Sequence, residues 1–596
     1  MFTGFNYDAM FPKDMQNFFQ LHIQAMNDFM ENYNKDPDAN WKNLLNVTHI
    51  YQKWASELMC KPTAIWEAQY QAAQDSIQFW SQFQNQLFQS DISKPFLQPD
   101  LKDKRFLSPE WKENPLFNFY EQFYLLFSKH CLDFVKQNPS QDPKVAKQVL
   151  FFTRLILDAL SPTNYVLTNP DVLKHTWDTQ GKNLIEGYKH FLEDCLRGQG
   201  HWNIKMTDIS AFEVGENLAV TPGKVVYQNR LIQLIQYTPT TEQVVERPLL
   251  MVPPWINKYY ILDLKEKNSL VKWIVDQGVT VYMISWVNPD KSYKETTFAD
   301  YMQEGVIEAL NAIQEDSGQE TINTLGFCIG GTLLATTLGY LKAKNSKLIE
   351  SATFLTTLID FSEPGDVDVF IDEEQISTLE ARMEFEGYLD GRVLMATFNY
   401  LRSNDLLWPY YINNYLCGKN PFPFDLLYWN CDSTNLPYKM HSFYLRNMYL
   451  ENRLVQPGKL EILDVKIDLS KVKTPAYFLS TEQDHISPWE TTFWGAKALG
   501  SDVTFVLGGS GHIAGVVNPP SNQKYGYRYN EIHFKNCHTI EEWLEKAAHE
   551  EGSWWNHWMQ WLKKYSGETT IARIPGESKL QIIQDAPGDY VKKHIF

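Results

Sequence analysis

The first 200 residues carry apolar side chains at the spacing of α-helices. From about residue 14, apolar residues recur three and four positions apart, as in DMQNFFQLHIQAMNDFMENY and AIWEAQYQAAQDSIQFWSQFQNQLF, and this repeat places them on one face of a helix. A proline-rich stretch from Ser90 to Pro115 predicts an irregular connection between groups of helices. We therefore expect an all-α N-terminal domain over residues 1–205, whose aromatic stripes are more typical of a packed core than of a binding face.

Beyond residue 210 the pattern changes to short runs of β-branched and aromatic residues bounded by turn residues. These runs include KVVYQNR, PLLMV, VTVYMISW, TINTLGF, SATFLTT, TPAYFLST and VTFVLGG. Helical stretches such as DLKEKNSLVKWIVDQG separate them, and this alternation is typical of a mainly parallel sheet with helices on both faces. We expect residues 206–596 to form an α/β domain.

One long interval breaks this alternation. A segment at about 360–472, rich in Tyr, Trp and Asn, separates SATFLTT from TPAYFLST. A doubly wound sheet does not need so long an excursion, so we expect an insertion over the carboxyl edge of the strands, where such sheets place their sites. This insertion is called the cap below.

Composition narrows the classes of partner. The chain contains 35 Phe, 31 Tyr and 19 Trp, which argues against disorder, and its formal net charge of −18 argues against a nucleic-acid partner. Its seven cysteines include no C-x-x-C pair, which favours a reducing compartment over a disulfide framework or a cysteine zinc site. The sequence shows neither a basic start followed by an apolar run nor about 18 consecutive apolar residues, so we expect a cytoplasmic protein without a membrane span.

The segment Gly326-Phe327-Cys328-Ile329-Gly330 stands between a predicted strand and a predicted helix. It is the G-x-C-x-G form of a nucleophile elbow, a sharp turn that strains the central residue and needs small residues two positions to either side. A thiol there lies at a helix N-terminus, whose amides favour the thiolate. We interpret Cys328 as a nucleophile; the structural alternative is a buried cysteine in a glycine-rich turn.

An acid and a base follow in the chain order that such elbows use. Asp484 comes after the strand TPAYFLST, and His512 comes after VTFVLGG. The order Cys328, Asp484, His512 predicts a catalytic triad on an α/β-hydrolase core. His485 is adjacent to the acid, so we expect it to support the site or face the substrate instead of acting as the base.

The turn after the strand PLLMV completes the expected site. In this fold one oxyanion amide comes from the residue after the nucleophile, here Ile329, and the other from the turn that begins at Pro253. The sequence does not fix which non-proline residue of that turn supplies the amide. We expect Trp255 and Asn257 close to the substrate, with a purely structural turn as the alternative, and no metal site.

A cysteine nucleophile points to acyl exchange between thioesters. Such an exchange is nearly isoenergetic, so a thiolate can take an acyl group from a thiol carrier and hold it for a second acceptor. Hydrolysis is then the side reaction, and a cap rich in aromatic residues would suppress it by excluding water.

Together these residues resemble the class I polyhydroxyalkanoate synthases. The motifs that carry the resemblance extend from about residue 105 onward and include FFTRLILDALSPTNYVLTNP, MVPPWINKYYILDL, LGFCIGGTLLA, FLTTLIDFSEPGDV, NDLLWPYYINNYLCGKNPFPFDLLYWNCDSTNLP and GSGHIAGVVNPPSNQKYGY. The first hundred residues are similar only in being helical and aromatic. One departure is Val287 in SWVNP, where the family usually carries a basic residue.

The resemblance implies an acyltransferase. It implies that Cys328 carries the growing acyl chain and that His512 is the general base with Asp484 as its acid partner. Either His512 or Asp484 then assists the hydroxyl that attacks a thioester to add one unit. The implied substrate is an (R)-3-hydroxyacyl-CoA, expected to be 3-hydroxybutyryl-CoA, which releases CoA when its acyl unit joins a polyester. CoA is then substrate and leaving group, and no resident cofactor is expected. The implied setting is a cytoplasmic polyester granule, with a homodimer, granule-associated proteins as partners, and residues 1–205 serving dimerisation and granule association.

Two other functions would use the same features. A cysteine thioesterase or polyester depolymerase would use the same triad with water as the acceptor, although enzymes of this kind normally use serine. A non-catalytic granule-coat protein could have kept the fold, but an intact triad with Gly326 and Gly330 in place argues against it. The acyl chain length is not fixed, because cap aromatics such as Trp408, Tyr410, Tyr411 and Trp429 either line an acyl tunnel or pack.

Overall fold

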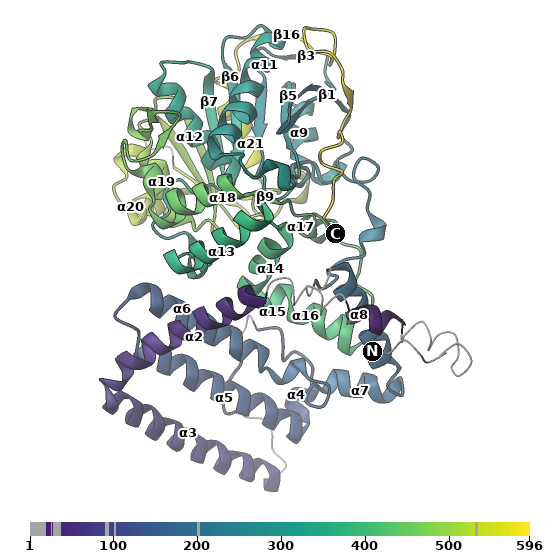
Figure 1. Cartoon of the computed structure of the whole chain (residues 1–596), viewed down its shortest axis with the longest axis vertical. Helices are drawn as coiled ribbons and strands as arrows, with labels where there is room; N and C mark the ends of the chain where they lie inside the picture. Colours follow the sequence, from purple (N-terminus) through teal and green to yellow (C-terminus); the bar gives the residue numbers. More distant parts are fainter. Residues whose placement is uncertain are drawn as a thin grey trace, which may run out of the picture. The chain divides into compact units, whose positions relative to one another are not determined.

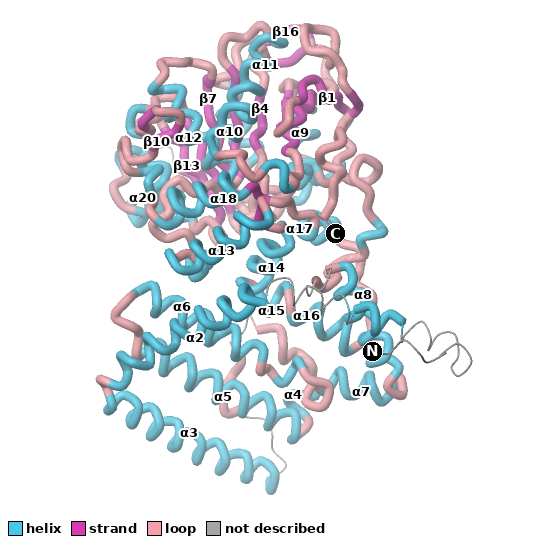
Figure 2. Tube along the Cα trace, viewed as in Figure 1, coloured by secondary structure: helices cyan, strands magenta, loops and turns pink. Residues whose placement is uncertain are grey.

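The computed structural model describes residues 20–25, 27, 37–89, 95–100, 103–198, 203–530 and 534–595. The chain forms two compact units. The helical unit comprises Met1–Asp208 with Ala396–Pro423 and Phe596, and the sheet unit comprises Ile209–Met395 with Phe424–Ile595. Among the described residues, all strands lie in the sheet unit (Figure 2). The expectation of a helical N-terminal region followed by an α/β-hydrolase core is confirmed.

The N-terminal part of the helical unit is a set of α-helices. They are α2 (Pro37–Met59), α3 (Pro62–Gln89), α4 (Glu110–Glu113), α5 (Pro115–Gln137), α6 (Pro143–Ala159), α7 (Pro170–Asp178) and α8 (Lys182–Arg197), with the 3₁₀ turn η2 (Pro162–Asn164). Neighbouring helices α2, α3, α5 and α6 run side by side (Figure 1).

Three of these helices begin at the same kind of dipeptide. The side chains of Asn114, Asp142 and Asn169 each accept a hydrogen bond of 3.0 Å from a backbone N–H in the first turn of α5, α6 and α7. The proline that follows takes the first helical position, where no N–H donor is needed. The sequence therefore encodes these helix starts locally.

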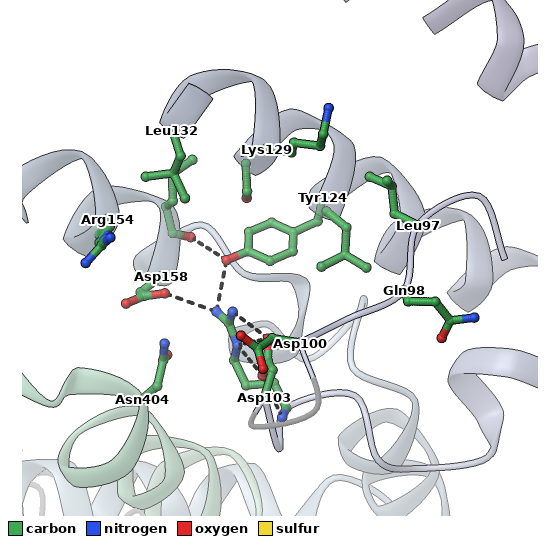
Figure 3. A pocket seen from close by; sticks show the side chains of 14 residues that line it. Leu97, Gln98, Asp100, Asp103, Tyr124, Lys129, Leu132, Arg154, Asp158 and Asn404 are labelled. Carbon is green, nitrogen blue, oxygen red and sulfur yellow. Dashed lines mark hydrogen bonds and ion pairs between the residues drawn. The ribbon is translucent and has the colours of Figure 1, made fainter. Parts of the chain in front are cut away.

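A half-buried arginine fixes the loop before α4 to the helices. Arg105 donates to both carboxylate oxygens of Asp103, to Asp158 at 3.2 Å and to the hydroxyl of Tyr124 at 2.9 Å. Figure 3 shows three of its partners, Asp103, Tyr124 and Asp158, in the wall of a cavity of about 410 Å³. The wall also includes Leu97, Leu132 and Asn404. The loop thus gains its position from one ion-pair network on α5 and α6.

Residues 396–423 pack against α8 within the helical unit. This segment holds the end of α14 (Gly391–Leu401), then α15 (Ser403–Leu406), α16 (Trp408–Tyr410) and the π-helical η9 (Tyr411–Leu416). The hydroxyl of Tyr415 donates to Asp194 at 2.7 Å, and the side chain of Asn183 donates to the carbonyl of Leu416 at 2.7 Å. A Cβ on Gly187 would lie 1.8 Å from the carbonyl oxygen of Tyr415. The segment that sequence analysis places inside the cap at 360–472 therefore divides between the two units.

One twisted sheet organises the other unit. Among the described residues its order is β15 (Ala548–Glu550), β14 (Tyr527–Tyr529), β13 (Val503–Gly508), β12 (Ala476–Thr481), β7 (Ile349–Leu355), β6 (Ile322–Phe327), β4 (Leu249–Val252), β5 (Val281–Trp286), β2 (Ile232–Tyr237), β1 (Gly223–Gln228) and β17 (Gln584–Asp585). The strands from β13 to β5 are parallel, and the outer strands join antiparallel. Every residue of β6 and β12 is buried, as expected for central strands with both faces covered.

Helices accompany the sheet in this unit (Figure 1). They are α9 (Leu270–Asp276), α11 (Glu308–Ser317), α12 (Ile329–Ala343), α19 (Trp489–Ala498), α20 (Ile540–Lys546) and α21 (Trp555–Lys563). On α21, the indole of Trp558 donates to Thr353 on β7 at 2.9 Å, and that of Trp555 donates to the carbonyl of Val516 at 2.9 Å. Trp558 thus anchors α21 to β7, and both of these buried indole N–H groups have hydrogen-bond partners.

The part of the cap that remains with the sheet unit is built of short elements. They are α13 (Glu373–Glu386), the start of α14, α17 (Asp425–Cys431), α18 (Tyr438–Tyr444), the π-helical η10 (Leu445–Leu450) and the two-residue strands β8 (Tyr388–Leu389), β9 (Leu436–Pro437), β10 (Glu461–Ile462) and β11 (Val465–Lys466). Two further strands, β3 (Gln243–Val245) and β16 (Thr569–Ile571), pair with each other.

Candidate active site

The turn from β6 into α12 holds Cys328 in strained backbone angles. Its φ is 53° and its ψ is −125°, a conformation that non-glycine residues rarely adopt. The amide of Cys328 donates to the carbonyl of Leu355 at 2.9 Å, and the carbonyl of Cys328 accepts from the amide of Gly331 at 2.9 Å. The strain is therefore held by hydrogen bonds on both sides of the residue.

The elbow glycines are required by close backbone approaches. A Cβ on Gly326 would lie 2.5 Å from the α-carbon of Gly331. A Cβ on Gly330 would lie 2.2 Å from the carbonyl oxygen of Val252 and 2.7 Å from that of Pro253. The elbow thus packs directly against the end of β4 and the turn that follows it.

A second strained residue adjoins the elbow. Thr356 follows β7 with φ 42° and is fully buried, and its amide donates to the carbonyl of Leu479 on β12 at 2.7 Å. Positive φ is unfavourable for a β-branched residue. Because the preceding carbonyl, that of Leu355, accepts from Cys328, this turn ties the elbow to the strand that leads to Asp484.

Asp484 and His512 form a buried pair. Oδ2 of Asp484 lies 2.7 Å from Nδ1 of His512, and Oδ1 accepts from the amides of Ile486 at 2.9 Å and Ser487 at 2.8 Å. A carboxylate only accepts, so Nδ1 of His512 donates and Nε2 is left for Cys328. The ring of His512 also stacks on Phe327, with centroids 5.7 Å apart.

The surroundings of His512 favour its protonated form. Burial alone would lower the pKa of His512, but the charges of Asp484 and Cys328 and hydrogen bonds to both side chains raise this pKa to about 10. A histidine in this state readily keeps a proton that it takes from a neighbouring thiol. The three side chains expected from sequence are therefore brought together in one site.

Ile329 is the first residue of α12, so its amide is among the helix N–H groups that have no partner within the helix. The turn after β4 faces the same helix end through Val252 and Pro253. Within the turn, the carbonyls of Trp255 and Ile256 both accept from Thr434, the first from its hydroxyl and the second from its amide at 3.1 Å.

The remaining residues expected near the substrate occupy different environments. Trp255 is buried among the rings of Trp286, Phe298, Tyr301 and Tyr444, and its indole N–H has no hydrogen-bond partner among the described residues. Asn257 is half-buried and forms an isolated bridge with Ser433. The carbonyl of His485 accepts from the amide of Asp366 at 3.3 Å. Trp255 and Asn257 thus belong to the turn that adjoins the elbow, and both contact residues of the cap.

Two cap tyrosines that the sequence analysis did not identify face the cysteine. Burial, with a smaller contribution from Cys328, raises the pKa of Tyr444 and of Tyr449 well above the ordinary value. Their rings are 5.5 Å apart in an edge-on arrangement. Tyr449 lies in the π-helical η10, a local distortion often found at functional sites. Their sequence spacing gives no signal, because only the path of the cap places them here.

The aromatics that sequence analysis named for the cap lie elsewhere. Trp408, Tyr410 and Tyr411 pack with Ile204 and Tyr415 in the helical unit. In the sheet unit, the indole of Trp429 donates to the carbonyl of Lys258 at 2.7 Å. Only the last of them is adjacent to the turn after β4.

Across the described residues, no group of three or more His, Cys, Asp or Glu is placed to hold a metal ion. None of the described helices has the length and apolar character needed to cross a bilayer.

A nucleophile elbow at the end of a central parallel strand, with an acid and a histidine after later strands, defines the α/β-hydrolase fold, and a family model of that fold matches residues 248–519. The model described as the N-terminus of poly-beta-hydroxybutyrate polymerase (PhaC) matches residues 102–274. Relatives extend this similarity over most of the chain. The chain belongs to the poly(3-hydroxyalkanoate) polymerase family, which confirms the resemblance inferred from the motifs.

Three of these relatives illustrate the similarity. The poly(3-hydroxyalkanoate) polymerase of Methylorubrum extorquens is 44% identical over 547 residues, which cover 92% of this chain and 89% of the relative. The polymerase subunit PhaC of Rhizobium meliloti (strain 1021) is 43% identical over 546 residues, 92% of this chain and 88% of the relative. That of Cupriavidus necator is 42% identical over 498 residues, 83% of each chain.

Proposed function

We propose that this protein polymerises (R)-3-hydroxyacyl-CoA, with 3-hydroxybutyryl-CoA as the first candidate, into a polyester and releases CoA. The observation that carries the proposal is the buried Asp484–His512 pair, whose histidine interacts with Cys328 at the elbow. Relatives named poly(3-hydroxyalkanoate) polymerases over most of the chain support the same reaction.

In the first step Cys328 acquires the acyl group. Nε2 of His512 takes the proton of Cys328, and the sulfur attacks the thioester carbonyl of the substrate. The amide of Ile329 and one amide of the turn after β4 stabilise the oxyanion. The carbon–sulfur bond to CoA then breaks, and the CoA thiolate takes the proton from His512.

In the second step a hydroxyl group replaces the sulfur of Cys328. The 3-hydroxyl of another hydroxyacyl unit attacks the acyl-cysteine, an ester bond forms, and the thiolate of Cys328 leaves. His512 is the better base for this hydroxyl because both oxygens of Asp484 are already engaged by two backbone amides and the imidazole. Asp484 then acts by holding the ring and balancing its charge.

The surroundings of Cys328 suit transfer to a hydroxyl better than transfer to water. The buried rings of Phe327 and Tyr444 and the half-buried ring of Tyr449 lie around the elbow and the base. Expelling water from such a site strengthens its electrostatic interactions and suppresses hydrolysis of the acyl-enzyme. CoA enters as part of the substrate, and the proposal needs no resident cofactor.

We place the protein at the surface of polyester granules in the cytoplasm, as a homodimer in contact with granule-associated proteins. One face of α3 offers a contact for a hydrophobic polymer, since Trp66, Tyr70, Ile77 and Trp80 follow helical spacing with exposures of 72%, 66%, 69% and 47%. Apolar faces of this kind mark interaction surfaces.

The test is the fate of 3-hydroxybutyryl-CoA. We expect the protein to release CoA and deposit insoluble polyester, and the Cys328→Ala variant to do neither. Cys60→Ala is the matched control, because that cysteine is exposed on the helical unit. Free 3-hydroxybutyrate as the sole product would assign the site to a thioesterase or depolymerase, and an unreactive Cys328 with no CoA release would assign the chain to a non-catalytic role.

A further inference from the structure

A buried ion-pair cluster lies where the cap meets the turn after β4. The side chains of Lys258 and Asp432 are 3% and 0% exposed, and their charged atoms are 2.8 Å apart. The hydroxyl of Tyr260 donates to Oδ2 of the same carboxylate at 2.8 Å. None of these three residues takes part in the chemistry described above.

The C-terminal segment completes this cluster. Nδ1 of His594 lies 2.8 Å from Oδ1 of Asp432 and 3.2 Å from Nζ of Lys258. The carbonyl of Lys593 accepts from Nζ of Lys258 at 3.1 Å and from the side chain of Asn288 at 3.0 Å. Figure 1 shows the end of the chain beside α17, the helix that leads to Asp432. Three segments far apart in sequence therefore meet at one carboxylate.

The cluster is continuous with the turn that faces the elbow. The residues directly before Lys258 are bonded to the cap through Thr434, which donates to the carbonyls of Trp255 and Ile256, and through the bridge between Asn257 and Ser433. At its other end the turn follows Val252, the last residue of β4. The carbonyl groups of Val252 and Pro253 lie so close to Gly330 that they leave no room for a Cβ there. The turn is thus fixed between the nucleophile elbow and the cluster.

Such a cluster is better suited to fixing geometry than to adding stability. Burying a lysine and a carboxylate costs several kcal/mol per ion, which their attraction offsets only when the geometry is good and the remaining donors and acceptors are satisfied. Here Nζ of Lys258 donates to Asp432 and to the carbonyl of Lys593, and both oxygens of Asp432 are engaged, Oδ1 by Lys258 and by Nδ1 of His594 and Oδ2 by the hydroxyl of Tyr260. Apolar side chains in place of Lys258, Asp432 and His594 could stabilise the fold as much, but they would not specify the direction of the turn.

We infer that Asp432 and His594 are positioning residues for acyl transfer, because with Lys258 they hold the turn at 253–257 in the place from which it offers its amide to the oxyanion beside Cys328. This inference rests on the proposed function. The C-terminal residues are then part of the site's support, although they lie far from Cys328 in sequence.

The test compares two properties of the same protein. His594→Ala and Asp432→Asn should slow single-turnover CoA release from 3-hydroxybutyryl-CoA by on the order of tenfold and a hundredfold, since a small misplacement of an oxyanion donor is costly. Alkylation of Cys328 by iodoacetamide needs no oxyanion and should stay within about twofold of wild type. His594→Asn, whose side-chain amide nitrogen replaces Nδ1, should recover most of the CoA release.

Lys593→Ala is the matched control. It removes only an exposed ion pair with Asp290, whose side chains are 54% and 58% exposed, and it keeps the carbonyl that binds Lys258. We expect it to behave as wild type in both assays and in thermal unfolding.

The outcomes separate the inference from the proposed function. Unchanged CoA release in His594→Ala and Asp432→Asn overturns the inference, and so does an equal fall in CoA release and alkylation, which would show general disruption of the site. A wild-type protein that releases no CoA overturns the proposed function instead. The variants are then compared on p-nitrophenyl butyrate, whose acyl transfer to Cys328 needs the same oxyanion amides.

Discussion

Asp484 binds the Nδ1 side of His512 with one carboxylate oxygen, at 2.7 Å, and two backbone amides with the other. The backbone of the loop that follows β12 therefore holds the carboxylate in place independently of the histidine. A carboxylate held in this way stabilises an imidazolium without having to move. The charge of His512 is thus controlled by a rigid partner.

Asp484→Asn should change the pH dependence of stability. Burial acts to lower the pKa of His512, but Asp484 and Cys328 raise it to about 10, above the ordinary value of about 6.5. A raised folded-state pKa stabilises the protein below the unfolded-state pKa, and this contribution is lost as the pH rises through the folded-state value. We expect wild type and variant to differ most in free energy of unfolding below about pH 6.5 and to converge toward pH 10.

Urea denaturation across this pH range measures the effect. Glu482→Gln is the control, because Glu482 forms a half-exposed ion pair with Arg528 at 3.5 Å and should leave the curve nearly unchanged. A difference that does not vary with pH would contradict this origin of the charge on His512.

Gly330→Ala should disturb the elbow itself. The new Cβ would lie 2.2 Å from the carbonyl oxygen of Val252, and backbone on both sides prevents relief by a side-chain rotation. We expect a loss of about 1–3 kcal/mol in the free energy of unfolding, together with slower CoA release. Gly508→Ala is the control, since its nearest neighbour, Cδ1 of Leu479, would be 3.5 Å away; equal stability of the two variants would show that the close approach is not rigid.

Tyr449→Phe should slow the reaction of Cys328 with iodoacetamide. Burial and the neighbouring sulfur raise the pKa of this tyrosine, so its hydroxyl stays protonated and can donate toward a thiolate. Losing a donor that stabilises the thiolate by ~1 kcal/mol corresponds to about a fivefold lower rate near neutral pH. Tyr438→Phe, on the lysine-facing side of α18, should leave the rate unchanged. An unaltered rate in Tyr449→Phe would mean that its hydroxyl does not stabilise the thiolate.

Arg105→Lys should destabilise the helical unit although it keeps the charge. A lysine cannot reproduce the bidentate contact with Asp103 together with the contacts to Asp158 and Tyr124. We expect a loss of about 1.5–3 kcal/mol, the contribution typical of hydrogen bonds to a charged group, measured by thermal unfolding. Lys53→Met is the control, because it removes an exposed ion pair with Asp142 and should lower the free energy of unfolding by less than about 1 kcal/mol. Similar losses in both variants would show that the contacts of Arg105 do not stabilise the helical unit more than an exposed ion pair does.

The exposed face of α3 should bind hydrophobic polymer. Trp66→Glu and Trp80→Glu each replace an exposed ring, and each should weaken adsorption to poly(3-hydroxybutyrate) particles by about tenfold, from lost apolar burial. Gln78→Glu adds the same charge to another side of the helix and should bind normally. The measurement is the fraction of protein that sediments with the particles, and equal binding of all three variants would exclude this face.

The candidate triad could be predicted from the sequence because its parts are local. Cys328 is enclosed by glycines between a strand and a helix, and Asp484 and His512 each follow a short apolar strand. The loops that follow parallel strands all lie at the carboxyl edge of the sheet, so such residues come close together. The helix starts at Asn114, Asp142 and Asn169 are local for the same reason.

Other features depend on long-range packing and gave no sequence signal. Tyr449 reaches Cys328 only through the path of the cap, and His594 reaches Asp432 from 162 positions away. Residues 396–423 look like the rest of the cap in composition, yet their place is set by hydrogen bonds from Asn183 and to Asp194. Contacts of this kind depend on the fold of the whole chain, not on a motif.

The division of the cap range has a consequence for how this protein can evolve. The chain passes between the units at 208–209, 395–396, 423–424 and 595–596, so the helical unit is not encoded by one continuous stretch. A gene fusion or deletion that exchanged only the first 208 codons would leave Tyr415 and Leu416 without the buried partners that they have on α7, α8 and Ile204. The two units must therefore be inherited together, and changes on α8 are expected to be matched by changes in η9.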